Sequence, residues 1–164
     1  MEVLEIAIAL VRRIDGDGIH WLLRDEDDAK YLNFIVAQRL EGELLRETLS
    51  REVAWRWELN RKRDFVVSSM AQLNVELDAQ FPGQSEMCHW KVAFVNVDIY
   101  RPAALEQLGR DVNARWVDSA TISKGTASDG RVLDPFVINL NKQYNVIKAW
   151  ETNQLGWHEC DPKS

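Results

Sequence analysis

The chain has 164 residues, of which 46% are hydrophobic and 28% are charged, and this is the composition of an ordinary globular domain. The longest apolar run near its start, residues 6–11, is far shorter than the roughly 20 residues that cross a bilayer, so we expect no membrane association. Twenty basic side chains against 26 acidic ones give a net charge of −6, which disfavours binding to long nucleic acids.

The predicted elements begin with strands. Residues 3–11 alternate in hydrophobicity with period two and carry small apolar residues on the second face, which predicts a strand covered on both sides. Residues 15–18 are a turn signal and residues 19–24 resume as a strand, which together predict a β-hairpin. The acidic run at residues 25–28 lacks the alternate spacing of a calcium loop and predicts a solvated turn. Residues 32–37 predict another short strand.

A central helix is predicted over residues 43–59, which contain neither Gly nor Pro. Its apolar stripe recurs every fourth residue, at Leu45, Leu49, Val53 and Trp57. Residues 64–77 and 89–100 are rich in Val and Phe and flank the turn residues 81–83. We therefore predict that they are paired strands.

The last third of the chain predicts a short helix over residues 102–108 and a short strand over residues 115–117. Asp134 and Pro135 then supply an N-cap and a first-turn proline for a closing helix. The apolar face of this helix is predicted to carry Phe136, Leu140, Tyr144, Ile147 and Trp150. Strands that alternate with helices in this order predict a mixed sheet between helical layers.

We expect one domain over residues 1–151 and a C-terminal tail over residues 152–164, because no Pro/Gly/Ser-rich linker divides the chain. Cys88 and Cys160 lie far apart in a chain with no other cysteine, which is typical of a reducing, cytoplasmic location. Together with His89 and His158 they offer four zinc-ligand side chains. Because adjacent residues of a strand point to opposite faces, Cys88 and His89 are not expected to share an ion.

Three charged residues of the central helix region keep a particular spacing: Glu43, then seven residues, then Arg51 and Glu52, followed by the aliphatic Val53. This resembles part of the Nudix box, Gly-x5-Glu-x7-Arg-Glu-U-x-Glu-Glu-x-Gly-U, in which U is aliphatic. The order of elements from about residue 3 to residue 150 also resembles that of Nudix proteins. The resemblance implies an α/β chain with a Nudix-type α/β/α sandwich and a mixed β-sheet.

The box is degenerate in this chain. Its first glycine falls on Ala37, its two further glutamates fall on Trp55 and Arg56, and its closing glycine falls on Glu58. In the family the glutamates converge on Mg²⁺, because a hard dication needs several oxygen ligands. Glu52 is therefore the remaining candidate for a catalytic and metal-binding residue. Arg56 follows it at the spacing that favours a helical ion pair.

Two interpretations of this substitution remain open. In the first, Arg56 takes the place of the metal and contacts a phosphate, Trp55 stacks on a base, and Glu43 and Arg51 complete the ligand-binding set. In the second, Trp55 is a packed aromatic residue and Arg56 is the surface partner of an ion pair, on a helix that has lost its chemistry.

Three functions follow from the resemblance. The first is a module that binds or senses a nucleotide or a nucleotide-derived small molecule, without ordinary magnesium-dependent pyrophosphohydrolase activity. The second is an active Nudix hydrolase that uses Mg²⁺ to cleave a nucleoside diphosphate linked to another moiety. The third is a ligand-free scaffold with a protein partner, or a homodimer. The chain is also similar to degenerate Nudix-like domains that occur beside second-messenger nucleotidyltransferases in bacterial antiphage defence, which implies nucleotide sensing or processing.

Overall fold

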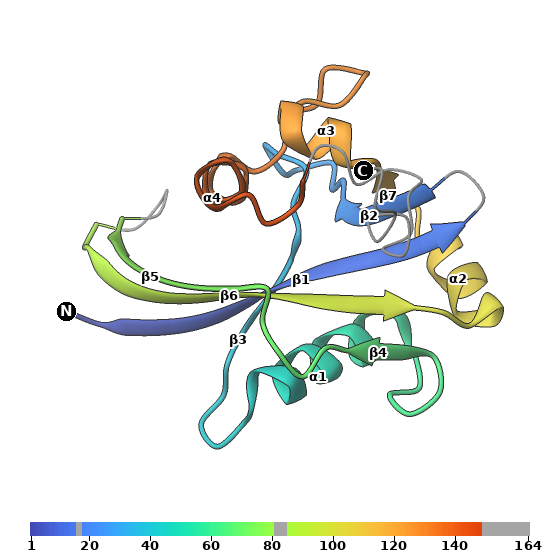
Figure 1. Cartoon of the computed structure of the whole chain (residues 1–164), viewed down its shortest axis with the longest axis horizontal. Helices are drawn as coiled ribbons and strands as arrows, with labels where there is room; N and C mark the ends of the chain where they lie inside the picture. The colour runs from blue at the N-terminus through green and yellow to red at the C-terminus, as the bar shows by residue number, and fades with distance from the viewer. Residues whose placement is uncertain (16–17, 81–84, 149–164) are drawn as a thin grey trace, which may run out of the picture. The chain divides into compact units, whose positions relative to one another are not determined.

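A computed structural model describes residues 1–15, 18–80 and 85–148 of the chain (Figure 1). They form two compact units, the first from residues 1–11 and 34–112, and the second from residues 12–33 and 113 onward. Strand β1 (Val3–Asp15) contributes its first part to one unit and its last part to the other. Within the described ranges, no helix is long and apolar enough to cross a membrane.

The first unit is built on strand β6 (Cys88–Ile99), which neighbours β1 in the sheet. Strand β3 (Ile35–Gln38) pairs with β1 in antiparallel fashion, with Ala7 opposite Ala37. Strands β4 (Phe65–Val67) and β5 (Leu73–Ala79) both pair antiparallel with β6. The predicted pairing of the two Val- and Phe-rich segments is therefore confirmed, although residues 81–84 of the connection lie outside the described residues.

The first of these two segments is not the continuous strand that its composition predicts. Val67 lies opposite Val97 and Leu73 lies opposite Phe94, so residues 68–72 face only residues 95 and 96 of β6. The extra residues leave the ladder as an ordered loop, in which the Ser68 hydroxyl donates a hydrogen bond to the Met70 carbonyl at 2.9 Å. The result is a gap in the edge of the sheet between β4 and β5.

Helix α1 (Leu45–Trp57) packs on β3 and β4 through Thr48, Leu49, Val53 and Trp57. The predicted stripe is thus confirmed at three of its positions, whereas Leu45 is only half-buried because it lines a pocket. The helix begins after Glu43 and Leu44, which the sequence places within it. Its last turn is anchored by the Trp57 indole N–H, which donates to Asp111 Oδ2 at 2.9 Å. Helix α2 (Pro102–Gly109) follows β6 as predicted and buries Ala104 and Leu108.

The second unit contains the predicted hairpin, in which the end of β1 pairs antiparallel with β2 (Gly18–Arg24). Residues 16 and 17 of its turn lie outside the described residues. Strand β7 (Ala114–Val117) confirms the short strand predicted over residues 115–117, and it pairs antiparallel with β2. The core of this unit includes Trp21, Leu22, Leu23, Leu32, Ile122 and Leu133.

Three details of the second unit differ from the sequence prediction. Residues 32–34 are not part of a strand, because Leu32 instead forms an isolated parallel bridge with Leu133. Helix α3 (Ser119–Lys124) was not predicted, although Asp118 caps it by accepting from the Thr121 N–H at 2.8 Å. Helix α4 (Pro135–Tyr144) begins at the predicted cap but ends before Ile147, and Trp150 lies outside the described residues.

The buried face of α4 consists of Val137, Ile138, Leu140 and Asn141, so the predicted face is confirmed only at Leu140 within the helix. The predicted Ile147 is also buried, but it lies beyond the end of the helix. Phe136 is half-buried and Tyr144 is exposed. The predicted α/β class is nevertheless confirmed: the chain combines a mixed sheet with helices packed on it.

Glu58 ends helix α1 in the left-handed conformation, with φ 54° and ψ 43°, and its N–H donates to the Ala54 carbonyl. Glycine adopts this conformation without penalty, whereas a residue with a Cβ pays about 1–2 kcal/mol. The resemblance to the Nudix box places its closing glycine at this residue. Glu58 therefore occupies a turn that a glycine favours.

We predict that Glu58→Gly stabilises the chain relative to Glu58→Ala by about 1 kcal/mol, because both remove the carboxylate and only glycine relieves the backbone strain. The larger entropy of glycine in the unfolded chain, about 0.4–1 kcal/mol, limits this gain. Chemical denaturation of the two variants measures the difference. Equal stability of the two would contradict the assignment of strain to Glu58.

Candidate functional site

The residues singled out by the Nudix-box spacing all lie in the first unit, along α1 and the loop before it. Glu43 lies in the loop between β3 and α1, and Arg51, Glu52, Trp55 and Arg56 lie on the helix. The helix therefore carries two groups of side chains. One ties the preceding loop to the helix, and the other lies in its last two turns.

Glu43 and Arg51 form the first group. Arg51 Nε donates to Glu43 Oε2 at 2.9 Å, and Arg51 Nη2 donates to Glu43 Oε1 at 3.1 Å. Glu43 also accepts from the Leu40 N–H and from the Thr48 hydroxyl, both at 3.0 Å. The Arg51 guanidinium, followed by the Leu40 N–H, lowers the pKa of the Glu43 carboxyl to about 2. The pair is engaged internally and fixes the loop to the helix, and its role as a ligand contact stays a prediction.

Glu52 and Arg56 form the second group. The predicted ion pair is present, with Arg56 Nη2 and Glu52 Oε1 2.5 Å apart. The pair is partly buried, since the Glu52 side chain is 14% exposed and the Arg56 side chain is 24% exposed. Arg56 Nε is buried and finds no hydrogen-bond partner within the described ranges. A guanidinium therefore already neutralises the carboxylate that the resemblance assigns to the metal.

Trp55 lies next to this pair and is 74% exposed. The interpretation of Trp55 as a packed aromatic residue is therefore wrong. The Trp55 indole exposes its apolar surface to solvent and does not pack into the core. It is therefore available for stacking against a planar ligand.

Among residues 1–15, 18–80 and 85–148, no group of three or more His, Cys, Asp or Glu side chains is arranged to hold a metal ion. Cys88 is buried, whereas the His89 ring lies between Asp78 Oδ1 at 2.7 Å and Glu76 Oε1 at 3.2 Å. These two carboxylates, Asp78 first, raise the pKa of His89. His158 and Cys160 lie outside the described residues.

Arginines of the second unit organise the acidic run at residues 25–28. Arg131 Nε and Nη2 donate to Asp25 Oδ1 at 3.0 and 2.8 Å, and Arg115 Nη1 lies 3.4 Å from Asp25 Oδ2. Arg115 also binds Asp129 Oδ2 at 2.8 Å. Asp25 is thus the centre of an ion-pair network, whereas Asp27 and Asp28 form the exposed turn that the sequence predicts.

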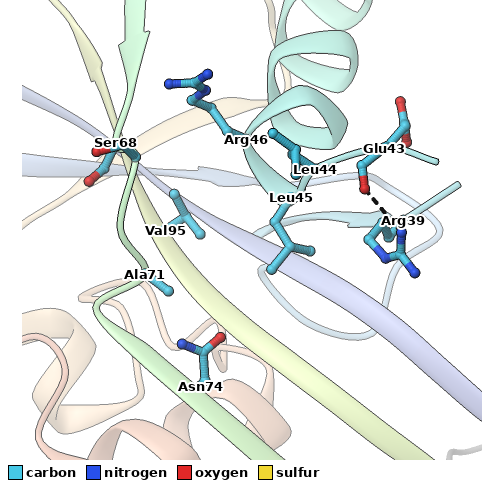
Figure 2. Close-up of a pocket in the computed structure, with 10 residues that line it drawn as sticks. Arg39, Glu43, Leu44, Leu45, Arg46, Ser68, Ala71, Asn74 and Val95 are labelled. Atoms are coloured by element: carbon cyan, nitrogen blue, oxygen red, sulfur yellow. Dashed lines mark hydrogen bonds between the residues drawn. The ribbon is translucent and has the colours of Figure 1, made fainter. Parts of the chain in front are cut away.

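A pocket of about 560 Å³ opens in the first unit, between the start of α1 and the loop that interrupts β4 and β5 (Figure 2). Of the predicted site residues, only Glu43 lines it. The residues that sequence reasoning missed are Arg39, Arg46, Ser68, Ser69 and Asn74. A sequence signal exists for Ser68 and Ser69, since residues 68–72 contain two serines and no β-branched residue, which is unusual within a strand.

Comparisons with known proteins show the fold. No protein-family model and no curated protein matches the sequence. Among solved structures, the Nudix hydrolase RenU from M. smegmatis matches with a TM-score of 0.57 and 15% identity, over 90% of this chain and 88% of that one. A mutT/nudix family protein from Listeria innocua matches with a TM-score of 0.53 and 12% identity, over 87% and 92% of the two chains.

The Ap4A hydrolase of C. elegans is similar over 90% of this chain and 96% of its own, with a TM-score of 0.51 and 13% identity. The chain therefore has a Nudix fold, as the spacing of Glu43, Arg51 and Glu52 predicts. At these identities the likeness establishes the fold and leaves the chemistry to the residues themselves.

The Glu43 pair generates a prediction about pH. Because the folded pKa of Glu43, about 2, lies below its ordinary value of 4.5, its stabilising effect is present above about pH 4.5 and is lost as the pH falls toward 2. We therefore expect the difference in free energy of unfolding between the parent chain and Glu43→Gln to shrink over this interval. Chemical denaturation at a series of pH values measures it.

Arg51→Gln is the matched control, because Arg51 is the largest cause of the lowered pKa. This variant should lose most of the same pH dependence while keeping the carboxyl group. A Glu43→Gln variant whose stability followed the parent at every pH would contradict the assignment.

Proposed function

We propose that this Nudix-fold chain is a module that binds or senses a nucleotide or a nucleotide-derived small molecule, and that it lacks ordinary magnesium-dependent pyrophosphohydrolase activity. The observation that carries the proposal is the last part of α1, where an exposed Trp55 adjoins the Glu52–Arg56 ion pair. An aromatic surface beside a guanidinium matches the two parts of a nucleotide, its planar base and its phosphate.

The electrostatics of this helix support binding over hydrolysis. Mg²⁺ is held by oxygen ligands, and in this fold family it serves to activate water and to neutralise charge on the phosphates. Positions 55 and 56 offer an indole and a guanidinium in place of two carboxylates, and Glu52 is already paired with Arg56. A cation brought to Glu52 would have to displace that guanidinium.

Arg56 still has hydrogen-bond donors that can bind a ligand. Its Nη2 donates to Glu52, and within the described ranges its remaining N–H groups have no hydrogen-bond partner assigned. A phosphate that approached the outer face of the helix would meet the Nη donors of this guanidinium, since Nε is buried.

The proposed partner is a small anionic molecule and not a long nucleic acid, because the net charge of −6 opposes a polyanion. A cytoplasmic location, a protein partner or homodimer, and an association with antiphage systems remain predictions from the sequence. So does the alternative of an active hydrolase, in which Glu52 would be the remaining carboxylate ligand for Mg²⁺.

We predict that at least one compound from a panel of nucleoside monophosphates, nucleoside diphosphates and dinucleotides binds the parent chain without added Mg²⁺. Arg56→Ala is expected to weaken that binding about 10- to 100-fold, through loss of a charge-assisted hydrogen bond. Trp55→Ala is expected to weaken it about 5- to 100-fold, through loss of base stacking. Titration calorimetry measures both.

Tyr100→Ala and Arg110→Ala are matched controls, since both remove an exposed side chain of the same chemical kind elsewhere in the first unit. They should leave the affinity unchanged, and circular dichroism should show that all four variants fold. If no nucleotide binds the parent chain, or if neither helix variant changes its affinity, the proposal is wrong.

We also predict that the parent chain releases no nucleoside monophosphate above the buffer rate when Mg²⁺ and a nucleoside diphosphate derivative are added. The double variant Trp55→Glu, Arg56→Glu should bind Mg²⁺ more tightly than the parent, because it supplies two further carboxylates beside Glu52. Robust hydrolysis by the parent that Glu52→Gln abolishes would instead establish the hydrolase.

A further inference from the structure

The pocket at the start of α1 lies at the other end of this helix from Trp55 and Arg56. Arg46 and Trp55 are nine residues apart, which at about 1.5 Å per residue is roughly 13 Å along the axis. None of Glu52, Trp55 and Arg56 lines the pocket. Its volume of about 560 Å³ falls within the range of small-molecule sites, about 300–1,000 Å³.

The charges that line this pocket do not cancel. Arg39 is paired with Glu5, its Nε and Nη2 lying 2.6 and 3.2 Å from the two carboxylate oxygens. Glu43 is paired with Arg51. Within the described ranges, Arg46 has no such carboxylate partner, although it lies on the same rim. The pocket therefore presents one uncompensated guanidinium.

Neutral hydrogen-bonding groups face the same space. Figure 2 shows Arg46 reaching from the first turn of α1 toward the segment that carries Ser68. The Ser68 hydroxyl is occupied by Met70. The Ser69 hydroxyl and the Asn74 amide have no partner among the residues that the structure describes, and both line the pocket.

The remaining wall is apolar and consists of Leu44, Leu45, Ala71 and Val95. Leu45 is half-buried and Val95 is buried, so the floor of the pocket is packed against the sheet. The gap between β4 and β5 creates this floor, because the loop over residues 68–72 leaves Val95 without an opposing strand residue. A ligand with an organic part as well as a charged group would fill the space.

We propose that this pocket is a second binding site, for a small molecule that carries a phosphomonoester. The Arg46 guanidinium contacts the phosphate, Ser69 and Asn74 donate to its other oxygens, and the organic part lies over Leu45 and Val95. Three donor groups on separate elements suit the several terminal oxygens of a phosphate better than the two oxygens of a carboxylate. The site does not depend on Trp55 or Arg56.

Calorimetry in the double variant Trp55→Ala, Arg56→Ala tests this site alone, because that variant lacks the contacts of the proposed function. The probes are AMP, ribose 5-phosphate and adenosine, at low ionic strength. AMP and ribose 5-phosphate should bind and adenosine should not. Adding Arg46→Gln should weaken AMP binding about tenfold or more, whereas adding the exposed control Arg61→Gln should not.

Backbone amide signals of residues 46, 69 and 74 should shift on titration with ribose 5-phosphate in the same background, which locates the ligand independently of affinity. The inference is wrong if AMP and ribose 5-phosphate fail to bind this double variant, or if Arg46→Gln binds AMP as tightly as Arg61→Gln. Either result would leave the proposed function untouched, since that function is tested by the single variants of Trp55 and Arg56 in the parent chain.

Discussion

The arrangement of the first unit depends on the two-point ion pair between Glu43 and Arg51. The pair links residues eight positions apart, and the Glu43 carboxylate also binds Leu40 and Thr48 while Arg51 reaches the Gln38 carbonyl at 3.3 Å. The loop after β3 is thereby fastened to the middle of α1. Arg39 extends this fastening to Glu5 on β1, and its Nη1 donates to the Glu43 carbonyl at 3.0 Å. The loop before α1, the helix itself and strand β1 are therefore joined by the contacts of Arg39, Glu43 and Arg51.

With its start fixed in this way, α1 presents different chemistry at its two ends. The first turn places Arg46 over an open pocket, and the last two turns place Trp55 beside Glu52 and Arg56. The backbone has a Nudix fold, and α1 ends in a left-handed turn at Glu58. The resemblance to the Nudix box places Trp55 and Arg56 where the family has two glutamates, and Arg56 pairs with Glu52. The shared fold by itself therefore assigns no activity to this chain.

The pocket at the start of α1 also depends on the interruption of the strand segment between Phe65 and Ala79. A continuous strand would pair residue by residue with β6 and would cover Val95. The loop over residues 68–72 instead places two serines, Ser68 and Ser69, in the lining of the pocket at the start of α1. Extra residues in a strand bend it and expose its partner locally, and such irregularities often lie beside functional sites. In this chain the irregularity supplies both the opening and part of the polar wall.

Local sequence signals determined most elements of this protein: the alternation in β1, the buried stripe at Leu49, Val53 and Trp57, and the cap and proline before α4. The Glu52–Arg56 pair was also predictable, because its spacing along one helix brings the two side chains together. Only the tertiary structure decided that Trp55 is exposed, that residues 64–77 form two strands, and that Arg46, Ser69 and Asn74 share a pocket. These features depend on the register and packing of segments distant in sequence, which periodicity and capping, as local properties, do not specify.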